Sequence, residues 1–159
     1  MPGPLVDLSS DEHFIREALR QAEKGAEADE VPVGAVIVRE RRIIARAHNQ
    51  VETLKDATAH AEILAITQAS QAVGDWRLEG CTLYVTKEPC PMCAGAMVLA
   101  RLQRLVFGAH DSKGGAAGGL MNVVSHPSLH HQIELTGGIL ADICSRLLKD
   151  FFSGQRRED

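Results

Sequence analysis

Apolar residues near the start of the chain recur at the spacing of an amphipathic helix. Phe14, Ala18 and Ala22 stand four residues apart and so share one helical face. Ser9, followed three residues later by Glu12, predicts a capping box at the start of this helix. We therefore expect the chain to open with a helix that packs one apolar stripe against the rest of the protein.

A β-hairpin is predicted after this helix. Residues 33–38 and 43–47 are rich in β-branched side chains, and they flank the polar stretch 39–42. The hydrophobic pattern then lapses over residues 50–59, where we expect no regular element.

The middle of the chain alternates predicted helices and strands. Helical periodicity resumes over residues 61–72, and residues 81–86 and 105–107 have the apolar pattern of strands. A helix that begins at Pro91 separates these two strands. A helix between consecutive strands is typical of a parallel pair, which indicates an α/β fold. Since ligands bind at the carboxyl ends of strands in open α/β sheets, we expect the functional site there.

The last third of the chain is less regular. The glycine-rich stretch 114–119 lacks the lysine-serine ending of a phosphate-binding loop, and a mobile surface loop is one interpretation of it. A short strand is predicted at 132–135, and an amphipathic helix over 140–152. The apolar face of that helix is predicted to hold three residues at spacings of four, namely Ile143, Leu147 and Phe151.

The candidate chemistry lies in two short motifs. Cys90 and Cys93 are spaced C-x-x-C, and Pro91 between them is suited to the first turn of a helix, so both sulfurs can face one point. His60 completes a Cys₂His set, which suits tetrahedral zinc with its fourth position open for water. Glu62 is the natural proton carrier for that water. Because residues two apart point away from each other in a regular helix, we place His60 and Glu62 in a helix's first turn.

A purely structural zinc site is the alternative, and it would need a fourth protein ligand. The sequence offers seven further histidine or cysteine candidates for it: His48, Cys81, His110, His126, His130, His131 and Cys144. A glutamate beside a ligand has no purpose in such a site. We expect Cys81 and Cys144 to be buried packing residues instead.

Composition bounds the class of protein. The 159 residues, 45% hydrophobic and 24% charged, predict one globular domain spanning 1–159. The first residues lack the basic and apolar regions of a signal peptide, so we expect a cytoplasmic protein with no membrane association. A net charge of −4 is unlike that of a nonspecific nucleic-acid binder, which is usually basic.

The two motifs resemble the signature of the zinc nucleoside and nucleobase deaminases, in which H-A-E is followed by P-C-x-x-C. The resemblance extends from about Asp11 to Phe152 and is strongest to the bacterial deaminases of tRNA wobble adenosine. The most similar stretches are residues 31–35, 58–62, 82–86, 88–97 and 107–109, with Asp111, Lys113 and residues 115–118.

This resemblance implies a three-layer α/β/α cytidine-deaminase-like fold with a central mixed sheet of about five strands. It implies hydrolytic deamination of adenosine to inosine at the wobble position of tRNA, with one zinc ion per chain. The expected partner is a tRNA anticodon stem-loop, and a homodimer is expected by resemblance only.

The resemblance also implies a role for individual residues. His60, Cys90 and Cys93 would bind zinc, while Glu62 would shuttle protons. Five further positions would bind the substrate: Asn49 to the purine, Val33 and Ala61 at the base pocket, Asp111 to a ribose hydroxyl and Lys113 to a phosphate.

Two other functions remain open at this point. A deaminase of free guanine or cytosine would use the same zinc chemistry. A zinc-stabilised binding module would use the metal without catalysis.

Overall fold

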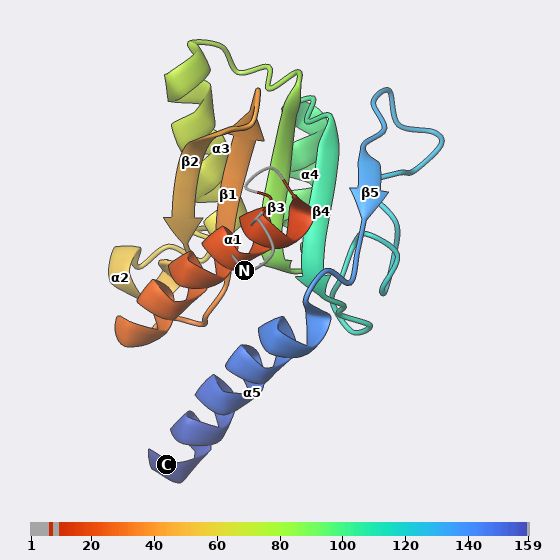
Figure 1. The fold of residues 1–159 in the computed structure, drawn as a ribbon. Coiled ribbons are helices and arrows are strands. Elements are labelled where there is room, and N and C mark those ends of the chain that lie inside the picture. The colour runs from red at the N-terminus through yellow and green to blue at the C-terminus, as the bar shows by residue number, and fades with distance from the viewer. Residues whose placement is uncertain (1–6, 8–9, 159) are drawn as a thin grey trace, which may run out of the picture.

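The computed structural model describes residue 7 and residues 10–158, which form a mixed sheet between two layers of helices (Figure 1). The helices are α1 (Asp11–Glu27), α2 (Val51–Leu54), α3 (Ala61–Val73), α4 (Pro91–Leu99) and α5 (Ala141–Glu158). The strands are β1 (Gly34–Arg39), β2 (Arg42–His48), β3 (Cys81–Lys87), β4 (Arg104–Ala109) and β5 (Glu134–Thr136). The predicted α/β class and the five-stranded mixed sheet are confirmed. No described helix is long and apolar enough to cross a bilayer.

The order and direction of the strands bring the ends of four strands to one edge of the sheet. The order is β2-β1-β3-β4-β5, with β1 antiparallel to both neighbours and the pairs β3/β4 and β4/β5 parallel. The predicted parallel pair, β3 and β4, is therefore confirmed. As a result, the carboxyl ends of β2, β3 and β4 share an edge with the amino end of β1.

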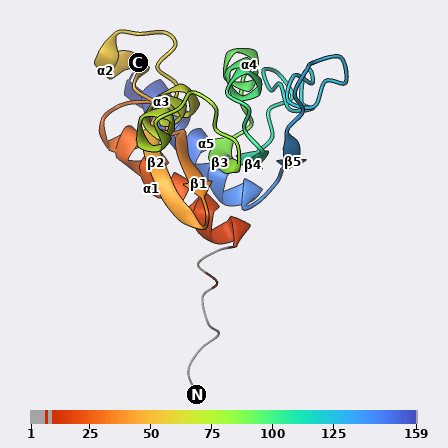
Figure 2. The ribbon, with the colours of Figure 1, turned by 90° about the horizontal axis from the view of Figure 1, so that it is seen from above.

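Helices cover both faces of the sheet. In the view along the sheet, α3 and α4 lie on one face, and α1 and α5 lie on the other (Figure 2). Side chains of β3 alternate between the two cores: Leu83 and Val85 pack in the α3/α4 core, and Tyr84 packs in the α1/α5 core. Because both faces are covered, residues 35–38 of β1 are all buried, a continuous apolar run.

Helix α1 follows its predicted pattern. Its expected stripe is buried, at Phe14, Ala18 and Ala22. The Oγ of Ser10 caps the helix by accepting a hydrogen bond from the backbone N–H of His13 at 3.1 Å. Ser9, which we expected to be the cap, lies outside the described residues.

The predicted hairpin has a tighter turn than the polar stretch suggested. Arg39 and Arg42 pair with each other, so only Glu40 and Arg41 form the turn. Both turn residues have left-handed backbone angles, with φ of 51° and 65°. Two consecutive left-handed residues give the twist that a two-residue hairpin needs.

The expectation of no regular element over 50–59 is wrong, because α2 forms there. Buried Glu30 holds the start of this short helix. Its carboxylate accepts hydrogen bonds from the backbone N–H groups of Glu52 and Thr53, at 2.9 and 2.7 Å, and from the Thr53 hydroxyl at 2.6 Å. The partner that caps α2 is thus more than 20 positions away, and no local pattern reveals it.

The predicted apolar face of the last helix is displaced by one residue. Ile143 is 44% exposed, while its neighbour Cys144 is buried. Cys144 faces the sheet at Gly108, where an added Cβ would lie only 2.4 Å from the sulfur. A small side chain is needed at this close approach, so Cys144 occupies the position that hydrophobicity alone would give to isoleucine. Leu147 packs against the same core as predicted.

The contact between α1 and β1 should make Gly34 intolerant of a side chain. A Cβ at this position would lie 2.0 Å from the Ala18 carbonyl oxygen and 2.5 Å from the Ala22 nitrogen, both backbone atoms. We expect Gly34→Ala to lower the free energy of unfolding by about 3 kcal/mol in urea denaturation. Gly154→Ala in α5 is the control. Apart from its chain neighbours and its own helix backbone, no atom of the described residues lies within 4 Å of a Cβ there. The stability of this variant should therefore rise by about 0.5–1 kcal/mol. Equal stability of the two variants would contradict this packing.

Candidate active site

Predicted site residues lie at the shared edge of the sheet, together with Lys87, which was not predicted as part of the site. Val33 directly precedes β1, Asn49 directly follows β2, and Lys87 ends β3. The backbone N–H of Asn49 donates to the Val33 carbonyl at 3.1 Å, which joins two of these positions. Asp111 lies two residues beyond β4. Residues far apart in sequence therefore meet because the strands end together.

Two helices on the same face begin at this edge, and their N-cap residues carry the candidate ligands. His60 caps α3 and Cys90 caps α4, with similar extended backbone angles (φ −74°, ψ 152° and φ −73°, ψ 171°). Neither side chain makes an N-cap hydrogen bond to its own helix by the usual geometry. Both side chains are thus free to face each other, and Pro91 fixes the first turn of α4.

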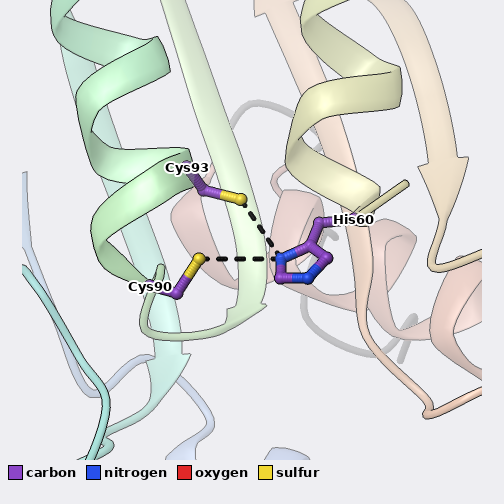
Figure 3. Close-up of side chains that lie close together, drawn as sticks. All are labelled: His60, Cys90 and Cys93. Carbon is purple, nitrogen blue, oxygen red and sulfur yellow. Dashed lines mark hydrogen bonds between the residues drawn. The ribbon is translucent and has the colours of Figure 1, made fainter. Parts of the chain in front are cut away.

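The three candidate ligands converge on one point (Figure 3). Nδ1 of His60 lies 3.6 Å from Sγ of Cys90 and 3.4 Å from Sγ of Cys93. Ligand atoms 2.0–2.3 Å from an ion at tetrahedral angles are about 3.4–3.8 Å apart, so this spacing fits zinc. Among the described residues, no acidic side chain and no further His or Cys joins these three in the group that could hold a metal ion. A Cys₂His set leaves one tetrahedral position open, as a catalytic zinc site requires.

One of the two cysteines, Cys90, carries the negative charge that a cation prefers. Hydrogen bonds with Cys93 and His60 lower the pKa of Cys90 to about 3, so its sulfur is a thiolate at neutral pH. The hydrogen bond to Cys90 raises the pKa of the Cys93 thiol above its ordinary value, and burial adds to the effect. Hydrogen bonding to Cys90 also raises the pKa of His60. The N-termini of α3 and α4 further favour negative charge at this point.

Glu62 lies in the first turn of α3, as predicted, and is almost fully buried, with 4% exposure. Burial raises the pKa of its carboxyl, because the charged form loses hydration there. The side chain also lies in hydrogen-bonding contact with Cys93. A carboxyl group with raised proton affinity beside a metal-binding cluster suits proton transfer.

A pocket of about 360 Å³ opens onto the cluster, a volume within the range of small-molecule sites. Seven predicted site residues line it: Val33, Asn49, His60, Ala61, Glu62, Cys90 and Asp111. Cys93 is buried behind them, and Lys113 is exposed on the loop that follows Asp111. The Oδ1 of Asn49 is a buried side-chain oxygen that has no hydrogen-bond partner in the described part of the chain. Such an atom in a pocket wall is a ready acceptor for a ligand donor.

Asp111 is held at the mouth of this pocket. Its Oδ1 accepts from the backbone N–H groups of Lys113 and Gly114, both at 3.0 Å, and its Oδ2 pairs with the Lys87 ammonium at 3.3 Å. Burial alone would raise the pKa of Asp111, but these hydrogen bonds and the Lys87 charge together lower it. Asp111 is therefore an oriented carboxylate at the start of an exposed loop.

Eight residues that line the pocket were not predicted as site residues: Asp29, Glu30, Val31, Val51, Glu52, Lys87, Glu88 and Phe151. Glu88 stands directly before the Pro-Cys motif, and that position was the one local signal available. Phe151 was predicted only as part of an apolar stripe, and Glu30 comes from a loop without a motif. Cys81 and Cys144 are free and buried, as predicted, and neither joins the ligand group.

The fold and the site together define a class of protein. A mixed sheet with a His-Cys-Cys cluster at two helix N-termini, next to a buried glutamate, is the arrangement of cytidine-deaminase-like hydrolytic deaminases. The chain belongs to the MafB19-like deaminase family, whose model matches residues 9–156. It is 50% identical over 151 residues to the tRNA-specific adenosine deaminase of Bacillus subtilis (strain 168), with 95% of this chain and 94% of that protein covered.

Solved structures agree with this assignment. A tRNA:A34 deaminase that edits A to I at the wobble position of transfer RNA has a TM-score of 0.80 and 46% identity, covering 86% of this chain and 99% of that chain. A guanine deaminase from Bacillus subtilis has a TM-score of 0.63 and 33% identity, covering 93% of this chain and 94% of that chain. Both likenesses extend over most of the chain, and the first is the higher in identity and TM-score.

We expect the purified protein to carry one zinc ion per chain, measured by elemental analysis. Cys90→Ala and Cys93→Ala should each lose the metal, because two remaining ligands hold zinc weakly. Cys81→Ala is the matched control, since Cys81 is a buried free thiol outside the ligand group. Full zinc occupancy in both site variants would show that these sulfurs are not ligands.

Proposed function

We propose that this protein is a zinc-dependent hydrolase that converts adenosine to inosine at the wobble position of tRNA. The observation that carries the proposal is the convergence of the His60-Cys90-Cys93 cluster, buried Glu62 and the unpartnered Asn49 oxygen on one base-sized pocket. The relatives named as tRNA-specific adenosine deaminases support this choice of substrate.

His60, Cys90 and Cys93 would hold the zinc ion. When bound, zinc supplies the Lewis acidity that makes water a nucleophile near neutral pH. Two thiolates offset most of the charge of the metal, so a protein base is still needed to take the proton from that water. The buried carboxyl group in the pocket is the base in position to do so.

Glu62 would move the protons of the reaction. It would take one proton from the attacking water and deliver it to the purine nitrogen next to the reacting carbon. It would then move the remaining proton of the added hydroxyl to the amine, which leaves as ammonia while the carbonyl forms. A single carboxyl can serve each step because its two oxygens accept and donate in turn. Burial raises the pKa of Glu62 above its ordinary value, which strengthens the carboxylate as a proton acceptor.

Asn49 would orient the purine, with Val33 and Ala61 as walls of the base pocket. An amide has both donors and an acceptor, so it can pair with the mixed edge of a purine. The buried Asn49 oxygen has no protein partner that a substrate would need to displace.

The charge of the pocket supports a base that enters while its backbone stays outside. Its lining includes the acidic residues Asp29, Glu30, Glu52, Glu62, Glu88 and Asp111 against the basic side chain of Lys87. A phosphate would be repelled within this wall, whereas a neutral base would not. A flipped adenine from a single-stranded loop meets this condition, because its phosphates remain outside the pocket, near the exposed Lys113.

The two alternatives have less support. A free guanine or cytosine deaminase would share the zinc chemistry, and the likeness to a guanine deaminase makes guanine the test substrate of choice. A noncatalytic zinc module does not account for a buried glutamate in the pocket, since an unneeded buried carboxyl destabilises the fold.

The proposed function also bears on the domain organisation, the cellular compartment and the oligomeric state. We propose a single deaminase domain over residues 1–159, working in the cytoplasm, where its cysteine ligands stay reduced. We also propose a homodimer. Five large apolar residues of α4 and the segment between β4 and β5 are exposed, a pattern typical of an interaction face: Met92, Leu99, Leu120, Met121 and Leu129.

Glu62→Gln tests the proton carrier. The amide keeps the shape of the side chain but cannot accept and release protons, so turnover should fall by about two to four orders of magnitude. Zinc content should stay at one per chain because Glu62 is not a ligand. Loss of zinc would make Glu62 a ligand instead, and near-normal turnover would remove it from the mechanism.

Asp111→Ala and Lys113→Ala test the substrate class. Inosine formation would be measured on anticodon stem-loops with ribose or deoxyribose next to the target, across a salt series. Asp111→Ala should reduce the preference for ribose by about 1 kcal/mol, the value of one hydrogen bond. Lys113→Ala should weaken RNA binding at low salt and flatten the salt dependence of binding. Without this phosphate contact, binding releases fewer counterions from the RNA.

Asp75→Ala is the control for these variants. Asp75 forms a similar turn, accepting from the Arg77 backbone N–H at 3.0 Å, just beyond the far end of α3. It should leave both the ribose preference and the salt dependence unchanged. Equal rates on every RNA, together with rapid conversion of free guanine, would replace the tRNA proposal with the free-base alternative.

A further inference from the structure

Three glutamates are buried among the described residues, and all three line the active-site pocket: Glu30, Glu62 and Glu88. Glu62 has a role in the reaction proposed above. The other two make hydrogen bonds to backbone groups in opposite walls of the pocket. Burying a carboxylate costs free energy unless hydrogen bonds compensate for its lost hydration. The burial of Glu30 and of Glu88 therefore needs an explanation.

The carboxylate of Glu88 binds backbone groups of residues 111–119, which we call the 111–119 loop. One carboxylate oxygen, Oε1, accepts from the backbone N–H of Asp111 at 3.0 Å. The other, Oε2, accepts from the N–H groups of Ala117 at 3.0 Å and Gly119 at 2.8 Å. One side chain thus fixes both ends of the loop. The interpretation of a mobile surface loop does not fit these bonds, nor the burial of Ala116 and Ala117.

The glycines of this loop make room for the Glu88 carboxylate. An added Cβ would lie 2.2 Å from Oε2 at Gly115 and 2.7 Å from it at Gly119. The Ala116 N–H also donates to the Pro89 carbonyl at 2.8 Å, directly before the ligand Cys90. The loop is therefore fastened to the same short segment that holds the metal cluster.

We propose that Glu88 is a positioning residue for RNA binding: it holds the 111–119 loop so that Asp111 and Lys113 meet the RNA backbone while the target base reaches Glu62. This inference rests on the tRNA substrate proposed above and assigns a role to a residue that does not itself contact RNA. It explains why a carboxylate is buried here. Both of its oxygens must accept hydrogen bonds, because the groups that face them are backbone donors.

Glu88→Gln is the sharpest test because it keeps the volume of the side chain. Its single oxygen can keep the bonds from Ala117 and Gly119, but its NH₂ group then faces the Asp111 N–H, a donor against a donor. The start of the loop, with Lys113, should lose its fixed position. We expect the Kd for an anticodon stem-loop to rise about tenfold, the scale of a lost hydrogen bond to a charged group. Zinc content and kcat at saturating RNA should stay within about threefold of wild type, an effect on binding rather than on chemistry.

A double-mutant cycle separates positioning from a general loss of stability. Lys113→Ala should raise the Kd at low salt in the wild type but have little further effect in Glu88→Gln, because the lysine is already displaced. Glu30→Gln is the matched control. Glu30 is equally buried and also accepts three hydrogen bonds, but it holds α2 on the opposite wall. Adding Lys113→Ala to Glu30→Gln should raise the Kd for RNA by the same factor as adding it to the wild type.

Gly119→Ala provides a second route if Glu88→Gln fails to fold. Its Cβ would lie 2.2 Å from the Asp111 carbonyl oxygen and 2.7 Å from Oε2 of Glu88, so it would displace the start of the loop and press on the same carboxylate. Its double-mutant cycle with Lys113→Ala should show the same coupling. Full additivity of Lys113→Ala with both variants, or wild-type RNA affinity in both, would overturn the positioning role. If instead the wild type makes no inosine on any stem-loop, the proposed function fails first. The two failures are thus distinguishable.

Discussion

The structure depends on the meeting of two helix N-termini above one edge of a sheet. Helices α3 and α4 start on the same face, and their N-cap residues, His60 and Cys90, leave their side chains free of capping bonds. The unpaired N–H groups and positive dipole ends of both helices therefore favour a thiolate cluster at their junction. Helix α4 begins where β3 ends, at this edge, and carries the chain back to the opposite edge, where the parallel strand β4 starts. The position of the candidate ligands thus follows from the topology.

Buried carboxylates then organise the surroundings of this junction. Glu62 is placed in the pocket by the first turn of α3, while Glu30 and Glu88 each bind backbone donors of a separate wall. Loops usually carry specificity in such folds, and here they are held by side chains that approach from the interior. Rigid walls suit a reaction that needs one base held close to a metal and a proton carrier. The same carboxylates make the pocket acidic, which admits a base but repels phosphate.

The grouping of the candidate ligands with Glu62 could be predicted from sequence because its signals are local. The C-x-x-C spacing with Pro91 and the short interval from His60 to Glu62 each lie within a few residues. The strand-helix-strand order is read from one continuous segment, residues 81–109. The parts that failed depend on distant contacts. Helix α2 forms over a stretch without hydrophobic pattern because Glu30 caps it from far along the chain. The face of α5 is displaced toward Cys144 because Gly108 lets the helix approach the sheet closely. The hydrogen bonds of Glu88 could not be predicted from sequence for the same reason, because all three donors lie more than 20 residues away along the chain.

The central claim is that this site hydrolyses the amino group of adenosine within RNA. The most direct measurement is mass spectrometry of the nucleosides released from a tRNA anticodon stem-loop after reaction in ¹⁸O-labelled water, with free guanine in the same mixture. The account predicts inosine at the wobble position with one labelled oxygen, ammonia as the co-product, and unchanged guanine. An unaltered stem-loop alongside conversion of guanine to xanthine would contradict it.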